Sequence, residues 1–250
     1  MTYCVAMNLA EGLVFVSDSR TNAGVDHIAT YRKLHVFGVP GERLVVLQSA
    51  GNLATSQSVI SLLRQRLNSD CSHLHNVSNL FEAVGLVGAT LREVLARDAS
   101  ATLGQGVDLG CSFLVGGQIG CESPRLFNIY PQGNFIESTE DTPYFQIGES
   151  KYGKPILDRF LKLETSIDEA ARCCLVSMDS TIRSNASVGP PVEMLIYHKN
   201  SFSLADYYCF DGDDDYLLKL RRSWESKLRE AISALPCLSK EAVKVMRVDL

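Results

Sequence analysis

The sequence predicts an α+β fold in which two antiparallel sheets stack face to face and helices cover the outer side of each sheet. Three observations support this prediction. Runs with high β propensity fall into three blocks, two pairs of helical segments separate the blocks, and short turns join successive strands. Strands joined by short turns pair antiparallel, and an amphipathic helix buries its apolar side on a sheet. The expected result is one four-layer αββα sandwich.

The first block of strands is expected to form two hairpins, over residues 2–9, 12–19, 33–39 and 43–51. A short Ala-Glu-Gly link joins the first two strands, and a tight connection of this kind pairs them antiparallel. Thr2 begins the first strand and Asp18 lies at the end of the second. The hairpin therefore places both residues at the same end of the pair.

The other elements follow from hydrophobic spacing and turn residues. Helices are expected over 52–67, 76–98, 150–163 and 166–184, strands over 110–119 and within 125–138, and a closing hairpin within 192–210. Pro131, Gln132 and Gly133 supply the turn within the second of these strand regions. Ser166 and Glu169 have capping-box spacing, which marks the start of the last helix.

Residues 2–210 make up this domain, and the character of the chain changes beyond it. Residues 211–250 are expected to form a helical extension, because an acidic turn leads into apolar residues at helical spacing. Asp211, Asp213 and Asp215 alternate, but the segment lacks the glycine and the final glutamate of a calcium loop. We interpret these acids as a solvated helix start. Either its own subunit or a neighbouring one must cover the apolar stripe, and we favour a role in assembly.

Composition argues against several classes of function. The net charge of -5 disfavours a nucleic-acid partner, which would require a basic surface. No apolar run approaches the roughly 20 residues of a membrane span, and the first residues lack the layout of a signal peptide. We therefore expect a cytoplasmic protein with no membrane partner.

No cofactor and no metal site is expected. Glycine-rich nucleotide-binding signatures are absent from the sequence. The eight cysteines show no Cys-x-x-Cys spacing, so we expect reduced thiols rather than a zinc site. His73 and His75 are close in sequence but lack an obvious third ligand, and we interpret them as a surface pair.

The start of the chain offers a nucleophile. Thr2 follows the initiator methionine, which is usually removed when a small residue comes next. The mature Thr2 would carry a hydroxyl and a free α-amine, whose reference pKa of about 8 lets it act as the base. A nearby positive charge would lower the pKa of that amine, and Lys33, held by Asp18, can supply it. Taken singly, the same residues also fit a strand start, a turn acid and a strand-edge charge.

Several runs together resemble a known family. Thr2 and the runs GLVFVSDSRTNAG, KLHVF and SAGNLA resemble proteasome-type β-subunits, which are N-terminal-nucleophile (Ntn) hydrolases of four-layer αββα fold. The long C-terminal extension and the run RSNASVGPP look most like the bacterial Anbu (ancestral β-subunit) branch. The resemblance implies that Thr2 is the catalytic nucleophile and that Asp18 and Lys33 assist it. It also implies that the backbone N–H of Gly51 forms the oxyanion hole.

Two departures from the family pattern concern the same site. The Asp-x-x-Ser motif of active subunits matches Ser184 to Ser187, so Ser187 is kept while Ser184 replaces the acid. The Gly-Ser-Gly motif matches residues 148–150, where either Glu149 stands at the serine position or Ser150 takes over its role. These changes predict altered proton transfer and a lower rate.

The leading hypothesis is a threonine-type peptidase that works as a large homo-oligomer on peptides or unfolded proteins. The sequence does not identify an unfoldase partner. Two alternatives stay open. The first is an Ntn amidase acting on a small-molecule amide, because the fold superfamily includes amidases and acylases. The second is a non-catalytic, self-assembling scaffold, which the changed residues Ser184 and Glu149 favour slightly.

Overall fold

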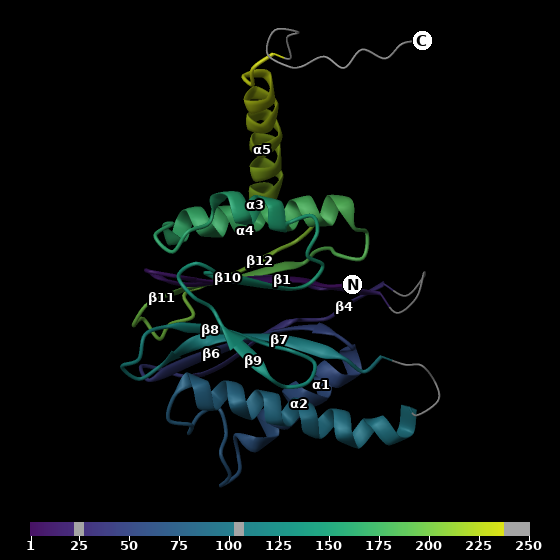
Figure 1. Ribbon diagram of the computed structural model, residues 1–250, viewed down its shortest axis with the longest axis vertical. Helices are drawn as coiled ribbons and strands as arrows, with labels where there is room; N and C mark the ends of the chain where they lie inside the picture. The colour runs from purple at the N-terminus through teal and green to yellow at the C-terminus, as the bar shows by residue number, and fades with distance from the viewer. Residues whose placement is uncertain (23–27, 103–107, 238–250) are drawn as a thin grey trace, which may run out of the picture. The chain divides into compact units, whose positions relative to one another are not determined.

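The computed structural model describes residues 1–22, 28–102 and 108–237. The chain divides into two units, Met1–Gly212 and Asp213–Leu250, which are treated separately below. The first unit contains two five-stranded sheets and four helices in four layers (Figure 1). This is the αββα sandwich that the order of strand and helix blocks predicts.

The two sheets form the inner layers, and neighbouring strands in each pair antiparallel. The first sheet has the order β10-β1-β2-β11-β12 and the second has the order β5-β6-β7-β8-β9. The first consists of β1 (Tyr3–Leu9), β2 (Gly12–Asp18), β10 (Tyr144–Gly148), β11 (Val192–His198) and β12 (Asp206–Phe210). The second consists of β5 (Leu34–Val39), β6 (Arg43–Gly51), β7 (Cys111–Ile119), β8 (Arg125–Ile129) and β9 (Phe135–Glu137). A short separate pair is formed by β3 (Arg20–Asn22) and β4 (Ile28–Thr30).

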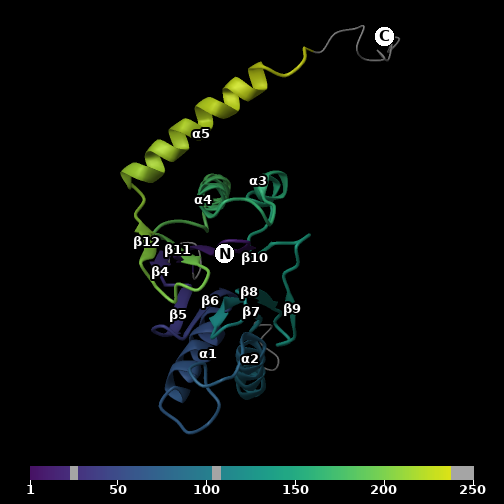
Figure 2. The ribbon, with the colours of Figure 1, turned by 90° about the vertical axis from the view of Figure 1, so that its left-hand side faces the viewer.

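Helices form the two outer layers, as both ribbon views show (Figures 1 and 2). The second sheet is covered by α1 (Leu53–Arg66) and α2 (Leu80–Thr102), and the first sheet by α3 (Lys154–Phe160) and α4 (Ile167–Ser184). Strand β6 contributes side chains to two hydrophobic cores, one on each face of its sheet. Its Val45 and Leu47 pack into the cluster with α1 and α2, whereas Leu44 and Val46 pack between the sheets. Successive side chains of a strand point to opposite faces, so a strand covered on both faces is apolar throughout.

The N-terminal hairpin forms in the expected register. Cys4 pairs with Ser17 and Leu9 with Gly12, so the start of β1 lies beside the end of β2. On its other side β1 pairs with β10, where Tyr3 lies opposite Gly148. Strand β1, at the beginning of the chain, therefore lies between β2 and β10.

Two features differ from the expected elements, namely the presence of three short strands and the capping of α4. The short strands β3, β4 and β10 were not foreseen, because three to five residues carry little periodic signal without their partners. The hydroxyl of Ser166 lies 2.6 Å from a carboxylate oxygen of Glu169 and makes no cap hydrogen bond to the helix backbone. The N–H of Ile167 instead donates to Glu11, at 3.0 Å, in the turn of the N-terminal hairpin. The predicted start of α4 at Ser166 is confirmed, but the N–H of Ile167 finds its acceptor in the distant Glu11 rather than in a capping box.

The second unit contains one described helix, α5 (Asp215–Ser233). Asp214 caps it by accepting hydrogen bonds from the N–H groups of Tyr216 and Leu217, so the acidic turn has a structural use. No residue of α5 is buried, and Leu228 and Ile232 are 47% and 63% exposed. The part of the predicted extension from residue 238 onward lies outside the described residues. Among the described helices, none has the length and apolar character needed to cross a membrane.

We expect Gly148→Ala to destabilise the first unit more than Gly41→Ala. Both glycines have positive φ, at +85° and +75°, but a Cβ at Gly148 would lie 2.1 Å from the Thr2 carbonyl oxygen, whereas one at Gly41 meets nothing within 4 Å. The backbone conformation alone costs about 1–2 kcal/mol, which Gly41→Ala measures, and the clash adds to this at Gly148. Urea unfolding of the two variants gives the difference. Equal losses of unfolding free energy would contradict the close approach of β10 to Thr2.

Candidate active site

A buried ion pair lies at the end of the N-terminal hairpin. The Lys33 ammonium is 2.6 Å from Asp18 Oδ1, and both side chains are almost fully buried. Lys33 also donates to the carbonyl oxygen of Arg20, at 2.7 Å. A buried charge is stable only when it is paired and hydrogen-bonded, so these contacts hold the ammonium in one place. The hairpin and the strand that follows thus bring together two residues that sequence analysis proposed for the site.

Asp18 also connects two other segments of the chain. Its Oδ1 accepts from the N–H of Tyr3, at 2.9 Å, and its Oδ2 accepts from the N–H of Gly189, at 3.2 Å. Burial raises the pKa of Asp18, while the Lys33 ammonium and the two backbone donors oppose that rise. The carboxylate fixes the residue that directly follows Thr2.

Thr2 is held by its backbone next to this pair. Its carbonyl oxygen accepts from the N–H of Glu149, at 2.6 Å, and Gly148 makes room for this contact. Met1 precedes it, is 62% exposed and lines the same cavity as Thr2. Removal of Met1 leaves a Thr2 whose backbone is fixed through the following residue.

Gly51 lies at the end of β6, immediately before α1. Its φ is +115°, and a Cβ there would lie 2.4 Å from the carbonyl oxygen of Gly110. Only glycine fits this turn. Asn52 caps α1 by accepting from the N–H of Thr55 at 3.1 Å, so the turn leads directly into a helix N-terminus, where backbone N–H groups favour negative charge.

A cavity of about 660 Å³ connects these residues, since Thr2, Lys33, Gly51 and Gly148 all line it. One wall is a single face of α1, formed by Leu53, Ser56, Gln57, Ile60, Ser61 and Arg64. The spacing of these six residues, at intervals of one, three or four, is that of neighbours on one side of a helix. The size is that of a ligand pocket, large enough for a peptide side chain and part of its backbone.

Glu149 takes part in a second polar network beside Thr2. One of its carboxylate oxygens accepts from the N–H groups of Ser150 and Lys151, both at 2.9 Å, and the other accepts from the Asn185 amide at 2.8 Å. Asn185 in turn accepts from the N–H of Ser187, at 3.0 Å. The hydrogen bond from Lys151 is the largest cause that lowers the pKa of Glu149, so the group is a carboxylate at neutral pH. This network fixes the loop that carries Ser187.

The remaining predicted residues lie apart from the cavity. Ser184 is exposed at the end of α4, and it is not among the residues that line the cavity beside Thr2. Ser150 is exposed and lines a different hollow, beside Lys154 and Asp158. Either Glu149 or Ser150 could match the serine of the Gly-Ser-Gly motif. Of these two residues, Glu149 is the one whose backbone contacts Thr2 and whose side chain is buried.

Sequence reasoning did not single out Asn185, His35 or Arg64. Asn185 stands inside the run RSNASVGPP, next to the motif serines, which is a signal that could have marked it. His35 and Arg64 line the cavity from β5 and α1, far apart in sequence. Only the packing of α1 on the second sheet brings them to one wall, and no local motif indicates this.

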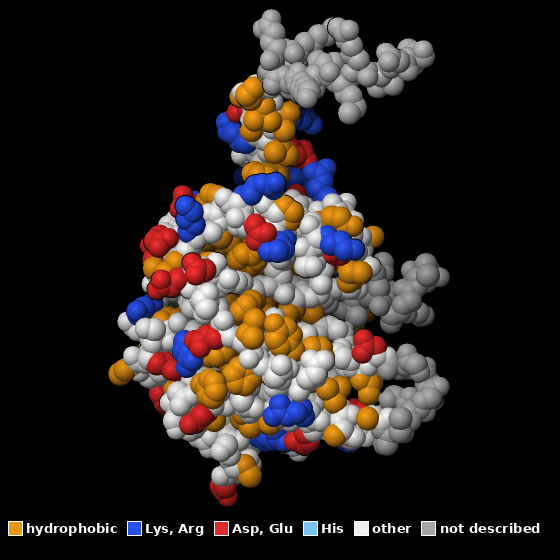
Figure 3. Space-filling view, in the orientation of Figure 1, with side chains coloured by type: hydrophobic (Ala, Val, Ile, Leu, Met, Phe, Trp, Pro, Cys, Tyr) orange, Lys and Arg blue, Asp and Glu red, His pale blue; other side chains and the backbone are white. Residues whose placement is uncertain are grey.

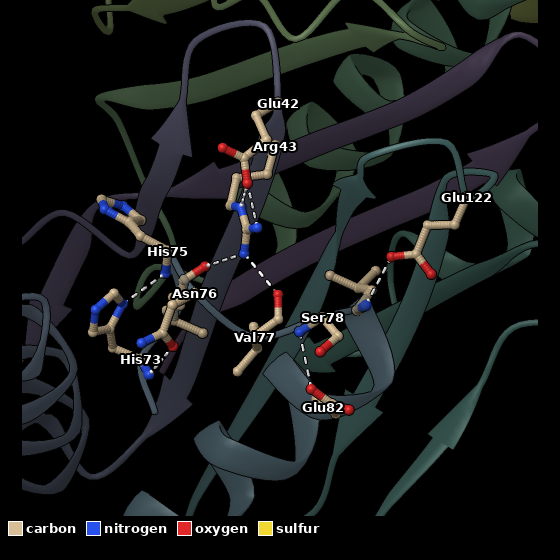
Figure 4. Close-up of polar contacts among 11 residues, drawn as sticks. Glu42, Arg43, His73, His75, Asn76, Val77, Ser78, Glu82 and Glu122 are labelled. Atoms are coloured by element: carbon tan, nitrogen blue, oxygen red, sulfur yellow. Dashed lines mark hydrogen bonds and ion pairs between the residues drawn. The ribbon is translucent and has the colours of Figure 1, made fainter. Parts of the chain in front are cut away.

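The histidine pair belongs to a structural loop (Figure 4). The ring nitrogen Nδ1 of His73 accepts from the N–H of His75, at 3.2 Å, and the Arg43 guanidinium donates to the carbonyl oxygen of Val77 at 2.8 Å. Arg43 is also paired with Glu42. Among the described residues no group of three or more His, Cys, Asp or Glu side chains could hold a metal ion. These contacts tie the loop before α2 to β6.

The chain belongs to the proteasome-subunit family, whose model, described as "Proteasome subunit", matches residues 2–197. Within this family it groups with the Anbu (ancestral β-subunit) proteins. It is 56% identical to Anbu from Yersinia bercovieri, with a TM-score of 0.90 over 95% of this chain and 99% of that chain. No curated protein matches the sequence.

Two further solved structures extend the comparison. The helical assembly of the Anbu complex from Pseudomonas aeruginosa is 57% identical, with a TM-score of 0.92 over 96% of this chain and 99% of that chain. A "Gly-1" mutant of Anbu from Hyphomicrobium sp. strain MC1 is 46% identical, with a TM-score of 0.89 over 96% and 100% of the two chains. The resemblance inferred from sequence runs is thus confirmed, together with the fold.

We expect Lys33→Met to lower the free energy of unfolding by about 3–5 kcal/mol, because it leaves the buried Asp18 carboxylate without a counter-charge. The double variant Asp18→Asn/Lys33→Met removes both charges and should recover a substantial part of that loss, since the asparagine still accepts from Tyr3. Urea denaturation of parent, single and double variants measures the coupling. If the double variant loses the sum of the two single losses, the pair is not an interacting unit.

Proposed function

We propose that this protein is a threonine-type peptidase of a proteasome-like assembly, with Thr2 as the N-terminal nucleophile after removal of Met1. The observation that carries the proposal is the cavity that Thr2, Lys33 and Gly51 line together, beside the buried Asp18. The family match supports the reaction class, because the matched region begins at residue 2. A nucleophile, a fixed cation and a glycine turn at a helix N-terminus are the parts that acyl transfer needs.

The proposed reaction uses one residue as nucleophile and base. The Thr2 Oγ attacks the peptide carbonyl carbon, and its proton passes to the Thr2 α-amine. The N–H of Gly51 stabilises the oxyanion, and the amine then gives the proton to the departing peptide amine. Water hydrolyses the resulting ester and frees Thr2. The ammonium of Lys33 lowers the pKa of the amine, so the amine is neutral at the start of each cycle.

Glu149 and Asn185 take a positioning role in this proposal. The resemblance places an acid where this chain has Ser184, and the next residue, Asn185, donates to the buried carboxylate of Glu149. It orients Asn185, which orients the backbone of Ser187. In this proposal the carboxylate belongs to the residue that follows β10, and the N–H of the same residue holds the Thr2 carbonyl oxygen.

A covalent test decides between peptidase, amidase and scaffold. We expect the intact mass of the native protein to show Met1 removed, and an electrophilic peptide probe for N-terminal threonine to add one equivalent. Thr2→Ser should still be labelled, because serine keeps the hydroxyl and the free amine, whereas Thr2→Ala should not be labelled at all. Retention of Met1 in the native protein would defeat the mechanism. Labelling by small amide-like electrophiles but not by peptides would favour the amidase.

We also propose that the protein self-associates and that α5 takes part in the assembly. The supports are the helical assembly formed by Anbu from Pseudomonas aeruginosa and the apolar side of α5, where hydrophobic side chains gather in Figure 3. On this side Leu228, Ile232 and Leu235 are exposed and the other apolar residues are half-buried, and exposed apolar surface marks an interaction site. The stripe comprises Leu217, Leu218, Leu220, Trp224, Leu228, Ile232 and Leu235.

Truncation after Gly212 should reduce the assembled mass in solution and leave a folded subunit, because the first unit ends there and retains β12. Sedimentation velocity gives the mass, and circular dichroism checks the fold. Leu228→Glu/Ile232→Glu should have the same effect as the truncation, while Lys227→Glu, which changes charge away from the stripe, should not. Full-sized particles from the truncated chain would rule out this role for α5.

A further inference from the structure

The charged side chains that line the cavity beside Thr2 are all positive. The lining includes three basic residues, Arg32, Lys33 and Arg64, and no aspartate or glutamate. A carboxylate side chain of a substrate would therefore meet only cations and neutral groups there. The remainder of the lining is His35 together with small, hydroxyl-bearing, amide or apolar residues.

Carboxylates behind the wall neutralise two of the three cations. Lys33 is paired with Asp18 at 2.6 Å, and Arg32 lies 2.8 Å from Glu193, which is almost fully buried. For Arg64, no carboxylate partner is found within the described parts of the chain. The uncompensated charge of the lining is therefore the Arg64 guanidinium.

Arg64 lines the cavity at the end of α1 that is farthest from Gly51, and it is exposed. It lies eleven positions after Leu53, about 16 Å along the helix axis, on the face that lines the cavity. Helical side chains lean toward the helix N-terminus, and α1 begins beside Gly51, so the long side chain shortens this separation. A substrate side chain that extends from Thr2 needs length to reach the guanidinium.

His35 lines the same cavity from β5, together with Arg32 and Arg64. Burial, followed by the charges of Arg64 and Arg32, lowers the pKa of His35 to about 4. The imidazole is therefore neutral at physiological pH, and its Nδ1 is buried without a hydrogen-bond partner. A neutral histidine beside two guanidinium groups supplies a further N–H donor for an anion without adding a carboxylate of its own.

We propose that this cavity selects an acidic side chain at P1, the residue whose carbonyl Thr2 attacks, with Arg64 as the specificity-determining residue. A carboxylate would form charge-assisted hydrogen bonds with Arg64, which an amide of the same shape cannot match. A basic P1 side chain is repelled, and an apolar one gains no ionic contact with Arg64. Glutamate is preferred to aspartate, because its longer side chain reaches farther along α1. The inference rests on the proposed function, since it assigns the substrate class to the same cavity.

The test uses the mature, assembled protein and two readouts. The first is the labelling rate with otherwise identical peptide epoxyketones that carry Glu, Asp, Gln, Leu or Lys at P1. The second is the Kd of N-acetylated peptides that end in Glu or Gln, measured by calorimetry, which requires no reaction. We expect Glu to exceed Gln at least about tenfold in both readouts, the range of a hydrogen bond to a charged group, and Glu to exceed Asp in labelling.

Two substitutions on the same helix sharpen the result. Arg64→Gln should abolish the preference for Glu over Gln, and Arg64→Glu should shift the preference to Lys. Arg66→Gln is the matched control, because Arg66 lies on the same last turn but pairs with Glu93 and does not line the cavity. This control should keep the parent's preference.

The outcomes separate the two proposals. Labelling by the Leu or Lys probe as fast as by the Glu probe would overturn the acidic preference and leave the peptidase intact. No labelling by any probe, together with tighter binding of the Glu peptide that depends on Arg64, would overturn the peptidase and support the acidic cavity. Equal Kd values for Glu and Gln peptides in the parent would also overturn the acidic preference.

Discussion

The buried contact between Asp18 and Lys33 is the constraint on which the site depends. Two charges removed from water are stable only with a partner and with their hydrogen bonds made, so this pair tolerates little movement. Asp18 accepts from backbone donors in β1 and in the loop before β11, and Lys33 reaches back to Arg20. One carboxylate thus joins segments from the beginning, the first quarter and the end of the domain.

The position of Thr2 follows from the same arrangement. Tyr3 is tied to Asp18 on one side, and the Thr2 carbonyl is tied to the strand end of β10 on the other. Gly148 is needed because any side chain at that φ would collide with Thr2. A residue held by its backbone in this way keeps its position relative to Lys33 and Gly51, so the proposed nucleophile would need little reorganisation.

Glu149 is a buried charge beside Thr2, and its backbone N–H donates to the Thr2 carbonyl oxygen. Glu149 keeps its charge because backbone N–H groups and Asn185 satisfy it, an environment that stabilises a buried carboxylate. On the α1 side, Arg64 lines the cavity without a carboxylate partner among the described residues.

The sequence by itself determined the layers, the N-terminal hairpin and the set of Thr2, Asp18, Lys33 and Gly51. These follow from local signals: hydrophobic period, turn residues and motifs a few residues long. Strand β10, the Glu11 cap of α4 and the cavity wall of His35 and Arg64 were decided only by the tertiary structure. Each of them joins groups more than twenty residues apart, and such pairings depend on how the layers pack. Short-range periodicity carries no information about which distant side chains that packing brings together.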